Sequence, residues 1–369
     1  MAISDRLQRR VALLLAAASL ACAPAPRMGE TVHIAEESAI IIWDATAKTQ
    51  HFIRRASFET KAKDFGFLVP TPTVPKLEEA DDKAFGHLKY VTRPKIVYRE
   101  IPRNAKSEAP KAAAATKSAP VKVVATAKVA GYDAVVLEAS DAAALNRWLS
   151  EHGYASSPEL IEWFKPYIEK KWRISAFKIS QERPDSNRAD AKAVRMSFET
   201  DTPFFPYREP ASQRSESAKG KQRMLRVFLL ADTRFGGTVG ADGAWPGETV
   251  WSDRIEERDR GKLLEHAKLP SSIAAGAMWL TEFEDRSSPR PGTDDVFFKT
   301  GADQTVIKRP DEVVYVHKSF GKMPVAAGSE SGWDIYELVF FFVAIAIAAG
   351  ILFGTWRLMA MLLRMLRSR

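Results

Sequence analysis

The sequence predicts an α+β protein in which a largely antiparallel β-sheet domain with a few helices is followed by one C-terminal transmembrane helix. Many short segments rich in β-branched and aromatic residues are separated by polar loops, as is typical of strands. Helical segments are few and do not alternate regularly with the strands, which disfavours a parallel sheet. The apolar run from Ile335 to Trp356 is long enough to span a bilayer.

The first strands follow one another closely. Residues 34–44 (IAEESAIIIWD) and 49–58 (TQHFIRRASF) predict two paired strands joined by a short polar connector. In the next segment, KDFGFLVPTPTVP, the apolar side chains of Phe65, Phe67 and Val69 alternate and therefore share one strand face. The prolines from Pro70 onward are expected to end this strand, because proline lacks the N–H donor.

The same segment contains Asp64-Phe65-Gly66, the triplet that binds magnesium in protein kinases. A kinase also needs a glycine-rich loop, a lysine on a following strand and a His-Arg-Asp loop, and the sequence has none of them. The triplet is therefore interpreted as the start of a strand.

The middle of the chain combines helices and strands. Residues 77–90 predict a short helix that begins with acidic residues, and residues 103–120, rich in Ala, Lys, Pro and Ser, predict a flexible insertion. One later helix is expected from Ser140 to Gly153, and another is capped by Ser157, with Pro158 at its first position. Further strands are predicted at 121–129, 132–138, 172–180, 193–199, 223–231, 278–283, 295–299 and 312–317.

The two ends of the chain predict its location. Residues 1–21 have the basic start, short apolar run and small residues of a secretory signal peptide. Residues 335–356 predict the transmembrane helix, and the arginine-rich tail 357–369 is expected to stay in the cytoplasm. The domain between them, residues 22–325, is then extracytoplasmic, so the sequence predicts a single-pass protein of the bacterial inner (cytoplasmic) membrane.

Two features near the ends have alternative interpretations. Cys22, the only cysteine, follows Ser19-Leu20-Ala21 at the expected cleavage site, where it is either acylated, as in bacterial lipoproteins, or unmodified. Ala346, Gly350 and Gly354 form a stripe of small residues on the predicted membrane helix. The stripe either packs against a second copy, giving a homo-oligomer, or reflects how common small residues are in such helices.

The net charge of +8 does not indicate a nucleic-acid partner. The signal region, the C-terminal tail and residues 103–128, which hold six basic residues and one acidic residue, together carry more positive charge than this net value. The rest of the external domain is slightly acidic, whereas nucleic-acid binding needs a basic surface.

Five stretches, taken in this order, resemble the bacterial domain-of-unknown-function family 2330. They are GETVHIAEESAIIIWD, HFIRRASFET, KDFGFLVPTPTVP, LNRWLSEHGY and TPFFPYREP, and the similarity extends from about residue 22 to 320. The resemblance implies an exported protein, in some members with a C-terminal membrane helix. It implies no particular activity.

No catalytic, cofactor-binding or metal-binding residues are predicted. Ser175 and Lys178, with Lys299-Thr300-Gly301, spell two motifs of penicillin-binding enzymes. That chemistry needs the serine and lysine on one helical turn, but residues 172–180 alternate as a strand, and the third motif is missing. The six histidines are scattered, without the i, i+4 spacing of a helical zinc site.

The aromatic residues of PFFPYREP, which are Phe204, Phe205 and Tyr207, either form a rigid binding surface or pack into the core, and core packing is favoured. Since no coherent catalytic set is present, we expect a non-catalytic extracytoplasmic binding or scaffolding domain. The alternative is an extracytoplasmic hydrolase whose residues come together only in three dimensions.

Overall fold

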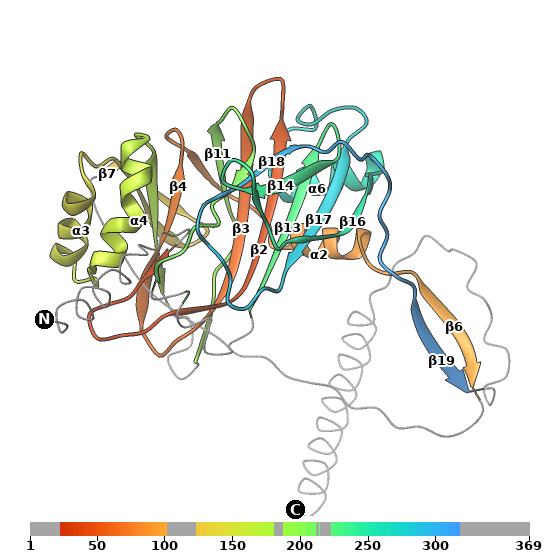
Figure 1. Cartoon of the computed structure of the whole chain (residues 1–369), viewed down its shortest axis with the longest axis horizontal. Helices are drawn as coiled ribbons and strands as arrows, with labels where there is room; N and C mark the ends of the chain where they lie inside the picture. The colour runs from red at the N-terminus through yellow and green to blue at the C-terminus, as the bar shows by residue number, and fades with distance from the viewer. Residues whose placement is uncertain (1–22, 102–122, 181–186, 212–213, 215–222, 318–369) are drawn as a thin grey trace, which may run out of the picture. The chain divides into compact units, whose positions relative to one another are not determined.

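The computed structural model describes residues 23–101, 123–180, 187–211, 214 and 223–317 (Figure 1). Contacts between residues divide the chain into two units. The second unit includes, among the described residues, only the distal ends of β6 (Ile96–Ile101) and β19 (Glu312–His317), which pair as a two-stranded sheet. The fold and the site described below belong to the first unit.

The first unit is built around a mixed sheet of eight strands, called here the main sheet. Its strands β2 and β3 form a long antiparallel hairpin, whose turn is held by Asp44 accepting from the backbone N–H groups of Thr46 and Ala47. β2 also pairs in parallel with β13, so the sheet is not antiparallel throughout. In order, the strands are β16 (Glu248–Arg254), β17 (Trp279–Asp285), β13 (Met224–Ala231), β2 (His33–Asp44), β3 (Thr49–Glu59), β11 (Val194–Glu199) and β5 (Lys76–Glu79), with β10 (Arg188–Asp190) beside β3.

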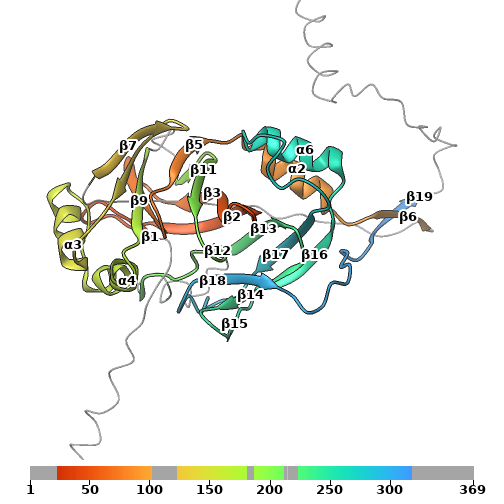
Figure 2. The same ribbon diagram turned by 90° about the horizontal axis from the view of Figure 1, so that it is seen from above.

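Helices α2 (Lys83–Val91) and α6 (Glu257–His266) lie against one face of the main sheet, called here the outer face (Figure 2). Ile40 of β2 and Ile53 of β3 share an apolar core with Phe85 of α2 and Leu263 of α6. On β2 this core begins at Ile40. The preceding part of the outer face therefore carries side chains of a different kind, described below.

The opposite, inner face of the main sheet packs against two smaller sheets in one large apolar core. Helices α3 (Ala142–Glu151) and α4 (Pro158–Glu169) cover the far side of the five-stranded sheet through a third core (Figure 2). The five-stranded sheet contains β1 (Ala23–Ala25), β4 (Asp64–Thr71), β9 (Arg173–Ser180), β8 (Tyr132–Leu137) and β7 (Val123–Val129), and the four-stranded sheet contains β12 (Phe204–Phe205), β18 (Val296–Thr300), β14 (Phe235–Val239) and β15 (Gly243–Ala244).

The aromatic stretch lies in the inner core. Phe204, Phe205 and Tyr207 are 0, 1 and 1% exposed. Gln50 fixes the stretch, because its amide nitrogen donates to the Phe204 carbonyl and its amide oxygen accepts from the Phe204 N–H, both at 2.8 Å. The core-packing alternative matches this arrangement, and none of the three aromatic side chains is available as an exposed binding surface.

The structure confirms the α+β class and most of the predicted elements. Strands β2, β3, β8, β9, β11, β13, β17, β18 and β19 lie within two residues of their predicted bounds. Ser157 caps α4 by accepting from the Leu160 N–H, and Pro158 is the first helical residue. The preceding helix is capped by Asp141 and begins at Ala142, slightly later than expected.

Two expectations need correction. Residues 77–79, expected at the start of a helix, belong to β5 because this strand pairs with β11, and α2 begins only at Lys83. Strand β4 continues through Pro70 to Thr71 instead of ending at the first proline. The neighbouring strand β1 pairs only with Gly66 to Leu68, so Pro70 lies beyond that pairing, where a missing N–H is tolerated.

Within the described ranges, no helix is both long enough and apolar enough to cross a membrane. The predicted signal peptide, Cys22, the insertion 103–120, the segment 335–356 with its small-residue stripe and the tail 357–369 all lie outside the described residues.

Candidate functional site

Two pairs of neighbouring charged residues lie on the β2–β3 hairpin: Glu36 with Glu37 on β2, and Arg54 with Arg55 on β3. Successive residues of a strand point to opposite faces of the sheet. Glu37 and Arg54 therefore face the inner core, whereas Glu36 and Arg55 face outward with Ser38, which pairs with Arg55 across the hairpin. Where these residues of β2 and β3 pair, the main sheet carries charged side chains on both faces.

On the inner face the charges form a buried network. Arg54 donates to Glu37 from Nε at 2.9 Å and from Nη2 at 2.6 Å. Arg290 lies between three acids, with Nη1 3.3 Å from Glu209 and 3.9 Å from Glu37, and Nε 3.4 Å from Asp285. The buried network is defined here as Glu37, Arg54, Glu209, Arg223, Asp285 and Arg290.

The composition of this network explains how it tolerates burial. Three arginines balance three carboxylates, and Arg223 pairs directly with Glu209. Burial lowers the pKa of Arg223 to about 9, which still leaves it charged at neutral pH. Because each acid faces an arginine at short range, the network has the character of a structural element that fixes the arrangement of the strands.

Tyr207 and Asp295 extend the network. The Tyr207 hydroxyl donates to Asp285 at 2.6 Å, and burial together with the Asp285 charge raises the pKa of Tyr207. Asp295 accepts from the Tyr167 hydroxyl of α4 at 2.8 Å and from the Tyr207 N–H at 3.1 Å. Burial raises the pKa of Asp295 to about 7.

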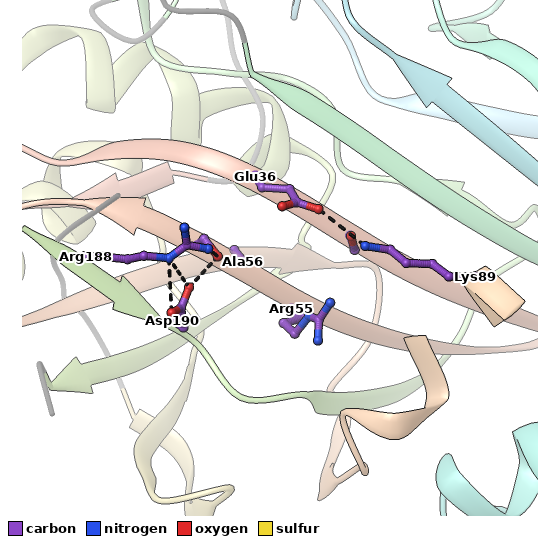
Figure 3. Close-up of a pocket in the computed structure, with 8 residues that line it drawn as sticks. Glu36, Arg55, Ala56, Lys89, Arg188 and Asp190 are labelled. Carbon is purple, nitrogen blue, oxygen red and sulfur yellow. Dashed lines mark hydrogen bonds and ion pairs between the residues drawn. The ribbon is translucent and has the colours of Figure 1, made fainter. Parts of the chain in front are cut away.

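On the outer face the charges line an open pocket of about 240 Å³, called here the polar pocket (Figure 3). Its volume corresponds to roughly eight water molecules, which suits a small polar molecule. Strands β2, β3 and β10 and helix α2 contribute its lining, which consists of Glu36, Ser38, Arg55, Ala56, Ser57, Lys89, Arg188 and Asp190.

Two groups of interacting side chains lie at opposite ends of the polar pocket (Figure 3). Arg188 Nε lies 2.9 Å from Asp190 Oδ1, and its Nη2 donates to Ser57 Oγ at 2.9 Å. Ser57 in turn donates to Asp190 at 2.5 Å, which closes a triangle of hydrogen bonds. At the other end, Lys89 Nζ lies 3.7 Å from Glu36 Oε1.

Arg55 lies between these two groups. Its Nη1 is 3.7 Å from Asp82 Oδ1, and its guanidinium carbon is 4.9 Å from the centre of the Phe85 ring. A separation of 3.7 Å is too long for a hydrogen bond. The Arg55 guanidinium donates no hydrogen bond to any residue that the structure describes, and Arg55 is one of the residues that line the pocket.

Lys89 lies near the positive charges of Arg226 and Arg55. Burial lowers its pKa, and the nearby charges of Arg226 and Arg55 lower it further, while Glu36 opposes the shift. The pocket can therefore present two cations whose hydrogen-bonding capacity is largely unused, Arg55 and Lys89.

The motifs of penicillin-binding enzymes are not assembled. Ser175 and Lys178 lie on β9, where three-residue spacing places them on opposite faces, and Ser175 is fully buried. Lys299 belongs to β18 of another sheet. In the part of the chain that the structure describes, no group of three or more His, Cys, Asp or Glu residues has the geometry to hold a metal ion.

The polar pocket was not predicted from the sequence, although one signal was present. Two adjacent acids on one predicted strand and two adjacent arginines on its partner necessarily place charge on both faces of the hairpin. The contributions of Lys89, Arg188 and Asp190 depend on pairings that local sequence does not reveal.

Comparison with known proteins identifies the family. The family model described as "Uncharacterized protein conserved in bacteria (DUF2330)" matches residues 16–296. The chain belongs to the DUF2330 family. The matched region includes all five stretches on which the resemblance was based and every residue that lines the polar pocket.

Beyond DUF2330, the comparisons add little. No curated protein sequence matches the chain. Among solved structures, the crystal structure of baculovirus P35 is similar with a TM-score of 0.34 at 6% sequence identity, covering 73% of this chain and 98% of that one. A likeness of this degree carries no conclusion about DUF2330 function.

Proposed function

We propose that this DUF2330 protein is a single-pass envelope protein whose extracytoplasmic domain binds a small polar ligand in the polar pocket without converting it. The carrying observation is Arg55, which lines a pocket of suitable size and whose guanidinium donates no hydrogen bond to any described residue. Hydrogen-bond donors of an arginine are seldom left unused unless water or a ligand takes them.

The lining of the pocket supports binding over catalysis. The eight residues include neither histidine nor cysteine, the side chains that most often act as general base or nucleophile near neutral pH. The Ser57 hydroxyl is already engaged by Asp190 and Arg188. These features suit recognition through charge and hydrogen bonds.

The proposed location rests on the chain ends. The predicted signal peptide at residues 1–21 and the predicted membrane helix at 335–356, which an arginine-rich tail follows, support a location of the domain outside the cytoplasmic membrane. Acylation of Cys22 and self-association through Ala346, Gly350 and Gly354 are further parts of this proposal.

The test is a ligand screen on the purified full-length protein in detergent. Small anions, cations and neutral sugars are added separately, and thermal unfolding, calorimetry and the chemical state of each compound are measured. We expect at least one compound to raise the unfolding temperature with increasing concentration and to be recovered unchanged.

Two outcomes contradict the proposal. If no compound stabilises the protein or gives a calorimetric signal, the pocket is not a binding site. If a compound is converted during incubation, the extracytoplasmic hydrolase is the better description.

A further inference from the structure

We propose that the polar pocket recognises a carboxylate or phosphate group, which Arg55 and Lys89 hold together at the edge of α2. This inference rests on the proposed binding function and adds the chemical class of the ligand. It follows from which charged groups of the pocket are already satisfied and which are not.

Each carboxylate of the pocket already has two neighbours that are cations or hydrogen-bond donors. Asp190 accepts from both Arg188 and Ser57, so its charge is neutralised within the pocket wall. Glu36 faces two cations, with Lys89 at 3.7 Å and Arg226 at 4.0 Å. A cationic ligand would have to compete with these partners for either acid.

The cations of the pocket differ in how far their hydrogen-bond donors are already used. Arg188 is committed to Asp190 and Ser57. Arg55 and Lys89 each have a single acidic neighbour at 3.7 Å, beyond hydrogen-bond distance. An anion entering the pocket can therefore accept charge-assisted hydrogen bonds from both without breaking an existing one.

The electrostatic surroundings favour the same charge. The lining contains three cations, Arg55, Lys89 and Arg188, against the two carboxylates Glu36 and Asp190. The positive charges of Arg226 and Arg55 disfavour the charged form of Lys89. A bound anion relieves this repulsion, so its binding should raise the pKa of Lys89.

Helix α2 brings Lys89 to this position. Lys89 lies in the last turn of α2, where a positive charge is also favoured by the negative end of the helix dipole. Arg55 lies against Phe85, one turn earlier on the same helix. The helix therefore holds one cation directly and supports the other through a ring contact.

The experiment uses full-length protein in nanodiscs of phosphatidylcholine, titrated by calorimetry with inorganic phosphate, succinate, glycerol or choline. We expect phosphate or succinate to bind and glycerol and choline not to bind. Arg55→Gln and Lys89→Met should each weaken that binding about tenfold or more, as loss of a charge-assisted hydrogen bond predicts. Lys83→Met, at an exposed position of the same helix as Lys89 outside the pocket lining, is the matched control and should change it less than about threefold.

A second set of discs contains phosphatidylglycerol and distinguishes free anions from lipid headgroups. If an anionic lipid headgroup is the ligand, these discs should weaken the apparent affinity for inorganic phosphate by competition, and otherwise the affinity stays the same. Lys89→Met, a change at a half-exposed helix position, keeps the test valid if Arg55→Gln fails to fold. NMR of the Lys89 side chain should show a higher pKa with phosphate or succinate bound.

The inference fails if glycerol or choline binds while phosphate and succinate do not, and in that case the broader binding function stands. It also fails if Lys83→Met weakens anion binding as much as Arg55→Gln and Lys89→Met do. If no compound of the screen or of this titration binds, both proposals fail together.

Discussion

The buried network and the polar pocket lie on opposite faces of the same hairpin and use the same kinds of side chain. Glu37 and Arg54 are bound at 2.6 Å in the core, with side chains 5 and 6% exposed. One residue away along each strand, Glu36 and Arg55 have side chains 41 and 35% exposed and ion-pair distances of 3.7 Å to Lys89 and Asp82.

The difference shows that burial, more than residue type, determines what a charge contributes. A buried carboxylate that loses its arginine leaves an uncompensated charge in a medium of low dielectric. An exposed carboxylate that loses its lysine is solvated by water at little cost. The inner face therefore uses its charges to fix the fold, while the outer face keeps cations available to a ligand.

The largest expected effect is a difference in the free energy of unfolding between variants of two adjacent glutamates, Glu37 and Glu36. Glu37→Gln should lower the free energy of unfolding by about 3–5 kcal/mol, because it leaves Arg54 without its charged partner inside the core. Glu36→Gln, the control on the other face, should lower it by less than about 1 kcal/mol. Urea unfolding followed by tryptophan fluorescence measures both values, and equal losses would contradict the comparison.

A second prediction concerns how the buried carboxyl group of Asp295 makes the stability depend on pH. Since burial raises the pKa of Asp295 from 3.8 to about 7, the folded state holds this proton more tightly than the unfolded state does. The contribution to stability is present at low pH and is lost as the pH rises from about 4 to about 7, by up to about 4 kcal/mol.

Asp295→Asn removes this titration because asparagine stays neutral. We expect the stability of the variant relative to the natural protein to increase across the same pH range, as measured by urea unfolding at several pH values. A stability difference that is independent of pH would show that Asp295 does not titrate as its burial predicts.

The smallest expected effect concerns the ion pair of the pocket. A double-mutant cycle of Glu36→Gln and Lys89→Met should give a coupling energy below about 1 kcal/mol, which added salt reduces further. The matched cycle of Glu37→Gln and Arg54→Met should give a larger coupling that salt barely changes. Similar couplings in the two cycles would remove the distinction between the faces.

Much of the fold could be predicted because its strands have strong local patterns. Residues 34–44 combine alternation with β-branched residues, and Ser157-Pro158 is a helix start that needs no tertiary information. Helix α6 was missed because ERDRGKLLEH is mostly charged, and only Arg260, Leu263 and Leu264 are buried. Its apolar stripe is too narrow to stand out from the surrounding polar loops.

The candidate site could not be predicted for a different reason. Glu36 and Glu37 are chemically identical in the sequence, and only the register of β2 with β3 decides which one enters the core. Asp190 joins the pocket because β10 pairs with β3 so that Asp190 lies opposite Ser57, a partner far away in the chain. Such pairings arise from tertiary packing, which local pattern does not encode.

The parallel pairing of β2 with β13 also bears on how the chain folds as it is made. The hairpin partner of β2 follows it immediately, whereas residues 224–230, which complete its other edge, follow only after all strands of the five-stranded sheet. Until they arrive, that edge of β2 has unpaired backbone groups that a strand from another copy can occupy. Pairing between such distant segments is slow. While the edge of β2 is unpaired, the nascent protein is prone to aggregate, and this is when chaperone binding should matter most.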